Sequence, residues 1–524
     1  MSFTGWLLFM LIVQVVHFAG TWKLYTIAGR KAWEAAIPVY NAVILMKIIN
    51  RPWWYTILLF VPIVNLIMLP VIWVETLRSF GRNSTTDTVL GVLSLGLYIY
   101  YINYAQNVSY VTDRSLKPRT SGGEWISSIL FAVVAATIVH TYVMQPFTIP
   151  TSSLEKTLLV GDFLFVSKFH YGARTPMTPI AFPMVHDTIP VAKVKSYVSK
   201  PQIPYFRIPG FQDIERNDIV VFNWPVDTLI DINPGSMRGS VQKPIDKKSN
   251  YVKRCVGLPG DSLEVRNGYV YINGKQNELP DRAKLQFGYQ FATSKPLNPK
   301  FAIEQYNITD IYPLNANYQV FQAHMTDAEY AKFKNYPSLD TIVKSAATKG
   351  EWNESTFPND EKFPWNSDFF GPIFIPKAGE TVAINTESIA LYKRIIEVYE
   401  GSELGIDNTI SLSGTQVLLN DQPITEYTFK MDYYWMMGDN RSNSQDARMW
   451  GYVPFNHVVG KPVFVWMSWD SNAKGISNKI RWERMFTTVG GSGAPVSYFK
   501  YFLIILGGWF IFNYFRKKRK VTKK

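Results

Sequence analysis

The 524-residue chain contains one cysteine, Cys255, so no intrachain disulfide can form and cysteine usage does not reveal the redox compartment. Charged residues are also scarce, at 18%, whereas aromatic residues reach 15%, a balance typical of membrane proteins. The sequence has no internal repeat, phosphate-binding loop, cofactor fingerprint or cluster of metal-ligating residues. We therefore expect a membrane protein that uses neither a cofactor nor a metal.

The net charge of +13 does not by itself indicate a nucleic-acid partner. The last nine residues, 516–524, hold seven lysines or arginines, so much of the excess belongs to one tail. This tail follows an apolar segment, where retention of positive charge on the inner side of a membrane explains it better. We expect no binding of nucleic acid.

Five apolar segments have lengths near the ~20 residues that a helix needs to cross a bilayer. They lie at about 4–20, 53–74, 88–104, 125–145 and 498–515. The first lacks a basic stretch before it and a cleavage site after it, so it is interpreted as an anchor. Residues 33–50 are apolar but carry Glu34, Asn41 and Lys47, which favours an interfacial amphipathic helix, with a full span as the alternative.

Basic residues predict the orientation of these spans. They gather in the loop after the first segment, in the loop before the fourth segment and in the tail: Lys23, Arg30, Lys31, Lys47 and Arg51; Arg114, Lys117 and Arg119; and the tail after Phe515. Five spans with these regions inside place the N-terminus and residues 146–497 outside. Arg78 and Arg82 fall on the wrong side of this arrangement.

A serine block follows the fourth span directly, at Ile149 to Asp162, and contains Ser153. A serine hydroxyl needs a base beside it, but none of the six histidines lies in this block or in the two described next, and no G-x-S-x-G motif occurs. The second block, Tyr251 to Asp261, carries Lys253 in an apolar, strand-like run about a hundred residues further on. Burial lowers the pKa of an ammonium group, so this lysine can serve as the base.

With a third, polar block at Gly438 to Arg448, the three blocks resemble bacterial type I signal peptidases, membrane-anchored proteases that remove signal peptides from exported precursors. The resemblance covers the flanking helix and, discontinuously, most of residues 147–470. It implies that Ser153 is the nucleophile of a Ser/Lys dyad, that Lys253 is its general base, and that an acyl-enzyme forms. It also implies a bacterial cytoplasmic (inner) membrane location, with precursor proteins, the lipid bilayer and the secretion translocon as partners.

The same resemblance assigns supporting roles. The backbone N–H of Ser153 and the hydroxyl of Thr151 would bind the oxyanion. Ser444 would orient the lysine, and Asp439, Asp446 and Arg448 would hold the site together through an Asp–Arg pair, although a polar turn is the simpler interpretation of Asp439 alone. Two shallow pockets for small side chains at positions −1 and −3 of the precursor would be formed by Phe147, Ile149, Pro150, Leu154, Leu164, Val221, Tyr251 and Val252. The chain departs from the family pattern at Ser152, Leu154, Lys156 and Ala447, and Lys156 leaves the shape of the local loop open.

Two other interpretations account for parts of the sequence. Ser153 and Lys156 also form S-x-x-K, the motif of penicillin-recognising acyl enzymes, which requires a helix. The residues after it look like a strand and the companion K-T-G is absent, so Lys156 is interpreted as a surface lysine. A catalytically dead, membrane-anchored β-domain is the third hypothesis, disfavoured because both Ser153 and Lys253 are present.

The exported part, residues 146–497, is predicted to be mainly β, as a partly open, barrel-like domain with an inserted cap. Strands are expected at 163–169, 218–224, 251–258, 262–273 and 462–469, with a hairpin at Asn267-Gly268. Residues 277–380 look like a long insertion with one short helix at the capping box of Thr326. The expected division is a membrane region at 1–124 with about three spans, an anchor at 125–145, catalytic parts at 146–276 and 431–497, a cap at 277–430, and a last helix with its tail at 498–524.

Overall fold

The computed structural model describes residues 3–118, 120–227 and 243–521. Arg119 and the last three residues of the basic tail, which entered the orientation argument, lie outside these ranges. The chain forms two compact units, one of residues 1–143 with 174–207 and one of residues 144–173 with 208–524.

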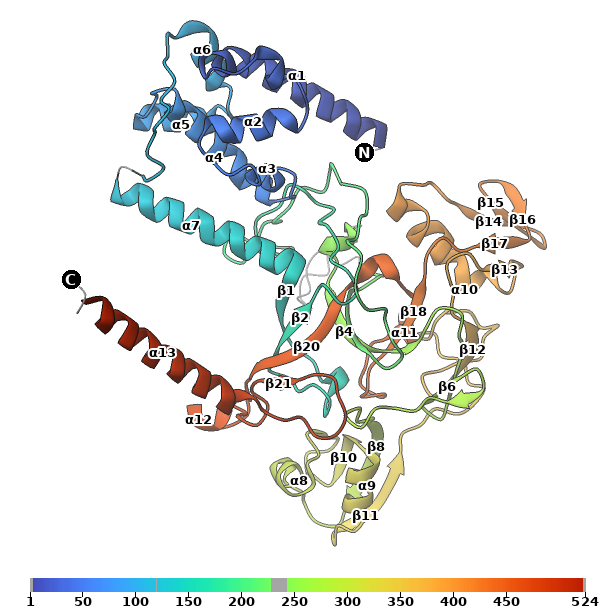
Figure 1. Cartoon of the computed structure of the whole chain (residues 1–524). Helices are drawn as coiled ribbons and strands as arrows, with labels where there is room; N and C mark the ends of the chain where they lie inside the picture. Colours follow the sequence, from blue (N-terminus) through green and yellow to red (C-terminus); the bar gives the residue numbers. More distant parts are fainter. Residues whose placement is uncertain (1–2, 119, 228–242, 522–524) are drawn as a thin grey trace. The chain divides into compact units, whose positions relative to one another are not determined.

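The first unit is helical (Figure 1). Its elements are α1 (Phe3–Ile27), η1 (Ala32–Ala35), α2 (Tyr40–Ile48), α3 (Tyr55–Leu58), α4 (Val64–Ser79), α5 (Thr85–Leu93), α6 (Tyr98–Ala105), α7 (Ser121–Ile138) and η2 (Val139–Val143). In the part of the chain that the structure describes, two stretches, Thr4–Ile27 and Ser121–Val143, are long and apolar enough to cross a membrane, or three if α5 and α6 count as one bent span. The predicted five spans are therefore not confirmed.

The two middle segments differ from the continuous helices that were expected. Segment 53–74 is divided between α3 and α4, because Pro62 disfavours helix at the residue before it and Ile63 takes a positive φ of 71°. Segment 88–104 is divided between α5 and α6, which meet at 118° around Gly96, whose φ is 84°. The longest helix within residues 33–50 is the nine-residue α2, about 14 Å long, too short for the full-span alternative.

The ends of both interrupted segments come together. Glu75 near the end of α4 forms ion pairs with Arg51, Arg78 and Arg114. The side chain of Arg82, before α5, donates a hydrogen bond to Gln106, after α6. Each segment therefore leaves and returns to the same end of the helical unit, and Arg78 lies beside the two arginines that were assigned to the inner side.

The second unit is built on an eight-stranded antiparallel sheet in the order β1-β2-β20-β3-β4-β18-β19, with β21 paired to β20 (Figure 1). Its strands are β1 (Met144–Thr148), β2 (Asp162–Ser167), β3 (Ile219–Asn223), β4 (Asn250–Gly257), β18 (Tyr433–Met437), β19 (Val453–Pro454), β20 (Val458–Ser468) and β21 (Thr487–Thr488). A mainly β domain is thus confirmed. The four expected strands in this sheet are present, and the last begins four residues earlier than predicted, at Val458.

A smaller sheet, β12-β5-β6-β7, packs on the same core. It comprises β5 (Ser262–Arg266), β6 (Tyr269–Ile272), β7 (Lys275–Gln276) and β12 (Phe369–Phe374). Asn267 and Gly268 join β5 to β6 with φ angles of 51° and 82°, the positive values that a two-residue hairpin turn of this type needs. The predicted hairpin is confirmed.

Part of the predicted insertion folds as a subdomain of its own, which we call the inserted subdomain (residues 287–344; Figure 1). It holds the sheet β11-β8-β10-β9 and two helices: β8 (Phe287–Thr293), α8 (Pro299–Tyr306), β9 (Asp310–Pro313), β10 (Val320–Met325), α9 (Asp327–Phe333) and β11 (Leu339–Lys344). Phe291, Phe321 and Phe333 form its core. The capping box at Thr326 begins α9 as predicted, whereas the sequence analysis missed all four strands.

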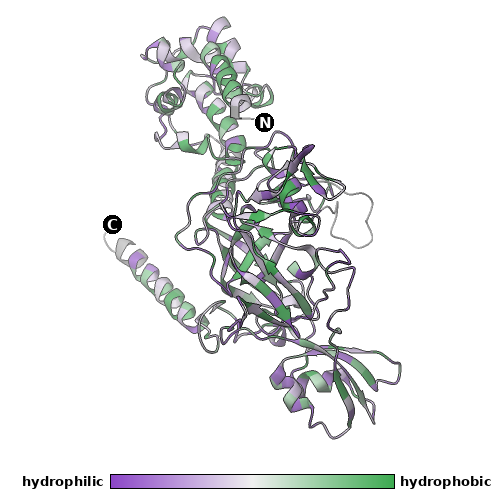
Figure 2. Cartoon of the chain, turned by 90° about the vertical axis from the view of Figure 1, so that its right-hand side faces the viewer, coloured by the Kyte–Doolittle hydropathy of each residue, from purple (hydrophilic) through white to green (hydrophobic). Residues whose placement is uncertain are grey.

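The rest of the second unit consists of short elements and the last helix. They are η3 (Ser152–Leu154), η4 (Ile245–Lys247), β13 (Thr381–Ala383), α10 (Ile389–Arg394), η5 (Ile395–Tyr399), η6 (Ser402–Leu404), β14 (Ile410–Ser413), β15 (Gln416–Leu419), β16 (Gln422–Ile424), β17 (Glu426–Thr428), α11 (Ala447–Trp450), η7 (Phe455–His457), α12 (Ile476–Lys479) and α13 (Phe499–Val521). Hydrophobic residues extend along much of α13 (Figure 2), and its Trp509 and Phe510 are exposed. Helix α13 is not one of the two stretches that are long and apolar enough to cross a membrane.

Candidate active site

Ser153 lies on η3, in the loop that joins β1 to β2. Backbone hydrogen bonds close the base of this loop, from Ile149 to the carbonyl of Asp162 and from Gly161 to the carbonyl of Ile149, both at 2.9 Å. Leu154 is 1% exposed and packs in an apolar cluster with Leu164. The loop is thus fixed at its ends and by its own leucine, and Ser153 is 6% exposed.

Lys253 lies on β4, and its side chain reaches the serine. Its Nζ is 2.6 Å from Oγ of Ser153 in a buried hydrogen bond. Burial lowers the pKa of Lys253 from 10.5 to about 8, because an ammonium group loses hydration; Asp446 opposes this shift, Arg448 adds to it and Asp439 opposes it. The structure therefore brings together the two residues that the resemblance pairs, with the amine in the environment that favours its neutral form.

Two buried ion pairs flank this contact. Arg254 binds Asp439 through two hydrogen bonds of 2.7 and 2.6 Å, and Arg448 binds Asp446 through two of 2.8 Å. Asp446 also accepts from the N–H of Gly438 and caps α11. Burial alone would raise the pKa of both carboxyls. The charge and hydrogen bonds of Arg254 on Asp439, and of Arg448 on Asp446, outweigh burial and hold both pKa values below the usual range. The sequence analysis assigned no role to Arg254. Because Arg254 follows Lys253 directly on a strand, its side chain lies on the opposite face of the sheet, where it pairs with Asp439.

The Gly438–Arg448 segment also holds the serine loop. The N–H of Asn440 donates to the carbonyl of Ser153 at 3.1 Å, and its side chain donates to the carbonyl of Ser152 at 3.3 Å. Nδ2 of Asn443 donates to Oγ of Ser152 at 3.0 Å. The third block thereby contacts the peptide bonds on both sides of Ser153.

Ser444 does not make the contact expected of it. Its Oγ is buried and makes no hydrogen bond within the described part of the chain, so the expected bond to Lys253 is not formed in this structure. The hydroxyl packs instead against Gly438, where an added Cβ would lie 2.2 Å from it. Thr151 is exposed at the rim of the loop with extended backbone, at a φ of −131° and a ψ of 155°.

Lys156 is not a solvated surface lysine, which corrects the interpretation made from the sequence. Its side chain is 9% exposed, its Nζ forms an ion pair with Glu329 at 3.1 Å, and it donates to the carbonyl of Asn307. Both partners belong to the inserted subdomain. The sequence around Lys156 contains no pattern that would predict these contacts. The short helical turn ends at Leu154, because Glu155 takes an extended ψ of 149°, and Lys156 follows with a positive φ of 70°, so the S-x-x-K residues do not share a helix face.

The residues expected to form the substrate pockets divide into two groups. Ile149, Leu154, Leu164 and Val221 are each at most 3% exposed and form the wall behind the site. Phe147, Val252 and Tyr251 are partly exposed, Pro150 is exposed, and the Tyr251 ring stacks on Trp224 with centroids 5.1 Å apart. The second group can meet a ligand at the surface, and the first can set the depth of any pocket.

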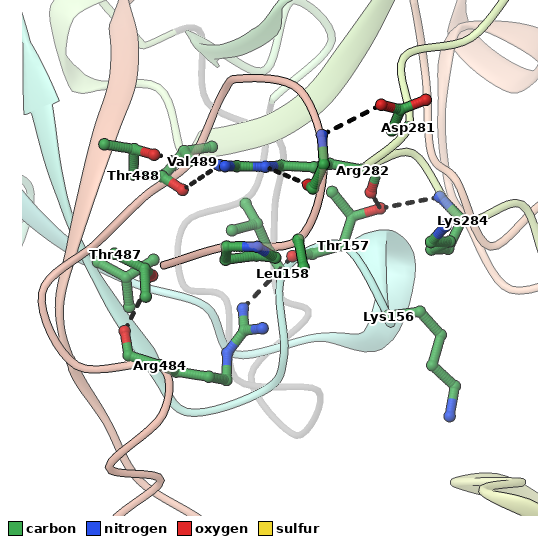
Figure 3. Close-up of a pocket in the computed structure, with 14 residues that line it drawn as sticks. Lys156, Thr157, Leu158, Asp281, Arg282, Lys284, Arg484, Thr487, Thr488 and Val489 are labelled. Atoms are coloured by element: carbon green, nitrogen blue, oxygen red, sulfur yellow. Dashed lines mark hydrogen bonds between the residues drawn. The ribbon is translucent and has the colours of Figure 1, made fainter. Parts of the chain in front are cut away.

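A cavity of about 380 Å³ is lined by neither Ser153 nor Lys253 (Figure 3). Its lining includes Thr157, Arg282 and Arg484. Arg282 donates to the carbonyls of Thr488, Gly490 and Gly493, and Arg484 forms an ion pair with Asp162. Both arginines are therefore engaged by the chain itself. No group of three metal-ligating side chains occurs in residues 3–118, 120–227 and 243–521.

The chain is similar to known proteins. The family model described as signal peptidase, peptidase S26, matches residues 122–321 and 375–469, together more than half of the chain. A family of unknown function matches residues 33–113.

Three similar curated proteins are each named signal peptidase I. That of Rickettsia massiliae is 30% identical over 69% of this chain and 87% of its own length. That of Helicobacter pylori is 26% identical over 70% and 92%, and that of Haemophilus influenzae is 24% identical over 71% and 78%. The chain therefore belongs to the signal peptidase family, peptidase S26, and is a serine endopeptidase.

Proposed function

We propose that this protein cleaves signal peptides from exported precursors with Ser153 as nucleophile and Lys253 as general base. The observation that carries the proposal is the 2.6 Å contact between Oγ of Ser153 and a buried Nζ whose pKa is lowered to about 8. At pH 7 that pKa leaves roughly a tenth of the lysines neutral, about 300-fold more than a pKa of 10.5 would.

The reaction runs in two halves. Neutral Lys253 takes the hydroxyl proton as Oγ of Ser153 attacks the scissile carbonyl, and the proton then passes to the leaving amine. The backbone N–H of Ser153 and the hydroxyl of Thr151 bind the developing oxyanion. Water, deprotonated by the again neutral lysine, hydrolyses the resulting ester on Ser153 and releases the signal peptide.

Specificity follows from an extended substrate. Alternate side chains of an extended chain face the same surface, so residues −1 and −3 meet the enzyme while −2 points away. The wall of Ile149, Leu154 and Leu164 leaves these pockets shallow, which favours alanine and other small side chains. Mapping the ends of cleaved precursors by mass spectrometry tests this: small residues at −1 and −3 are expected, and frequent Phe, Leu or Lys at −1 would contradict it.

The membrane arrangement is also part of the proposal. The stretches 4–27 and 121–143 span the bilayer, residues 28–120 face the cytoplasm apart from two re-entrant segments, and the catalytic domain, formed by 146–276 and 431–497, faces outward. The meeting of Arg51, Arg78 and Arg114 at Glu75 supports this, because it places basic residues of two loops and of the last turn of α4 at one end of the unit. The tail after Phe515 would return inside through α13, and the bilayer and the secretion translocon would be partners.

A further inference from the structure

Asp310, the first residue of β9, carries a buried carboxylate that faces the active-site loops. Its Oδ2 accepts hydrogen bonds from Nδ1 of His324 at 2.7 Å and from the side-chain amides of Asn440 and Asn443, each at 3.0 Å. The hydroxyl of Tyr312 donates to Oδ1. These donors, His324 first, hold the pKa of Asp310 far below its usual range despite its burial, so the group is ionised and only accepts.

The two asparagines connect Asp310 to the serine loop. The Nδ2 group of Asn443 also donates to Oγ of Ser152 at 3.0 Å, and that of Asn440 to the carbonyl of Ser152 at 3.3 Å. A side-chain amide nitrogen has two hydrogens, and each asparagine donates one to Asp310 and one to Ser152. Because a carboxylate cannot donate, it forces the nitrogen end of each amide toward itself and thereby fixes which end meets the residue before Ser153.

The inserted subdomain also contacts the serine loop on the C-terminal side of Ser153, at Glu155 and Lys156. Glu329 forms the ion pair with Lys156 at 3.1 Å, and the hydroxyl of Thr309 donates to Oε1 of Glu155 at 3.3 Å. The loop from 151 to 161 has little regular structure beyond one short turn, so these contacts on both sides of Ser153 supply much of its order.

We propose that Asp310 is a positioning residue for the catalytic serine, acting through Asn440, Asn443 and Ser152 to hold Oγ of Ser153 at Lys253. This inference rests on the proposed function of Ser153. A displacement of about 1 Å from the productive geometry can cost roughly a hundredfold in rate. Asp310 is buried, and the residues that hydrogen-bond to its carboxylate, His324, Tyr312, Asn440 and Asn443, are not among the expected pocket residues, so its loss acts on kcat and leaves KM nearly unchanged.

The test is a double-mutant cycle on the full-length protein in detergent, with kcat and KM measured on a model precursor. Asp310→Asn, which keeps the shape and removes the charge, is expected to lower kcat by tenfold or more with KM within about twofold. Ser152→Ala removes the hydroxyl that Asn443 holds. If the two act along one path, the double variant is little worse than Asp310→Asn alone. Asp340→Asn, an exposed carboxylate on β11 of the same subdomain, is the matched control and is expected to match wild type.

Several outcomes would overturn the inference: kcat of Asp310→Asn equal to wild type, a KM effect in place of the kcat effect, or losses that multiply in the double variant. If Asp310→Asn fails to fold, as judged by thermal unfolding, Asn443→Ala breaks the same path at the loop surface and must show the same loss of kcat and the same lack of additivity with Ser152→Ala. Wild type and Ser153→Ala run in parallel: if Ser153→Ala cleaves as well as wild type, the proposed function fails, whereas an inactive Ser153→Ala beside a fully active Asp310→Asn refutes this inference alone.

Discussion

The pKa of Lys253 makes a prediction about the pH dependence of catalysis. The base must be neutral to accept the serine proton, and its pKa is lowered from 10.5 to about 8. We expect kcat/KM to rise with pH along a single-proton limb whose midpoint lies near 8, and to level off above it. The assay is hydrolysis of a precursor-derived peptide from pH 6 to 10.5. If kcat/KM keeps rising to the pKa of free lysine, desolvation of Lys253 is refuted.

The same pKa has a consequence for stability, with a magnitude that follows from the structure. The folded-state pKa lies below the unfolded one, so the unfolded chain binds the proton more tightly and stability increases as pH rises from about 8 to 10.5. At 1.36 kcal/mol per pKa unit, the buried ammonium costs roughly 3 kcal/mol below pH 8. Lys253→Met is therefore expected to raise the melting temperature at pH 6.5, by an amount that shrinks by pH 10. An increase that is the same at both pH values would contradict this reasoning.

Three further predictions concern the remaining parts of the site and the membrane arrangement. Lys156→Ala should retain most activity whereas Lys253→Ala should abolish it in a precursor-cleavage assay; the reverse result would move the base to Lys156. Thr151→Val should lower kcat by about 10²–10³ if the hydroxyl binds the oxyanion, and an unchanged kcat would remove it from that role. A cysteine placed at Arg82 in a Cys255→Ser background should resist an impermeant thiol reagent in intact cells, while one on the exposed surface of residues 146–497 should react; labelling at position 82 would refute the re-entrant arrangement.

The family resemblance could propose Ser153 and Lys253 as the candidate dyad because both residues stand in short, contiguous blocks of sequence. Ser153 and Lys253 each stand in a recognisable run, and the strands around them carry the β-branched and aromatic residues that strands favour. The hairpin at Asn267 was predictable for a similar reason, since only a few residues tolerate its positive φ.

The contacts that sequence reasoning missed join residues that are far apart in the chain. Lys156 meets Glu329, Arg254 meets Asp439 and Asp310 meets Asn443, and no local pattern carries such pairings. The prediction of continuous spans at the two middle apolar segments was not confirmed for another reason. Length and hydropathy do not reveal a break in a helix such as the one at Ile63, which divides one predicted span into two helices. The sheet of the inserted subdomain was missed because Gly288 and Gln290 in β8 and Gln322 and His324 in β10 interrupt the apolar runs by which the other strands were predicted.

The most direct test of the account is cleavage of a model precursor by the full-length protein in detergent, comparing wild type with Ser153→Ala, Lys253→Ala and the double variant. Because the two residues act as a unit, both single variants should lose cleavage and the double variant should be little worse than either. Cleavage by Ser153→Ala at the wild-type rate and at the same peptide bond would contradict the central claim.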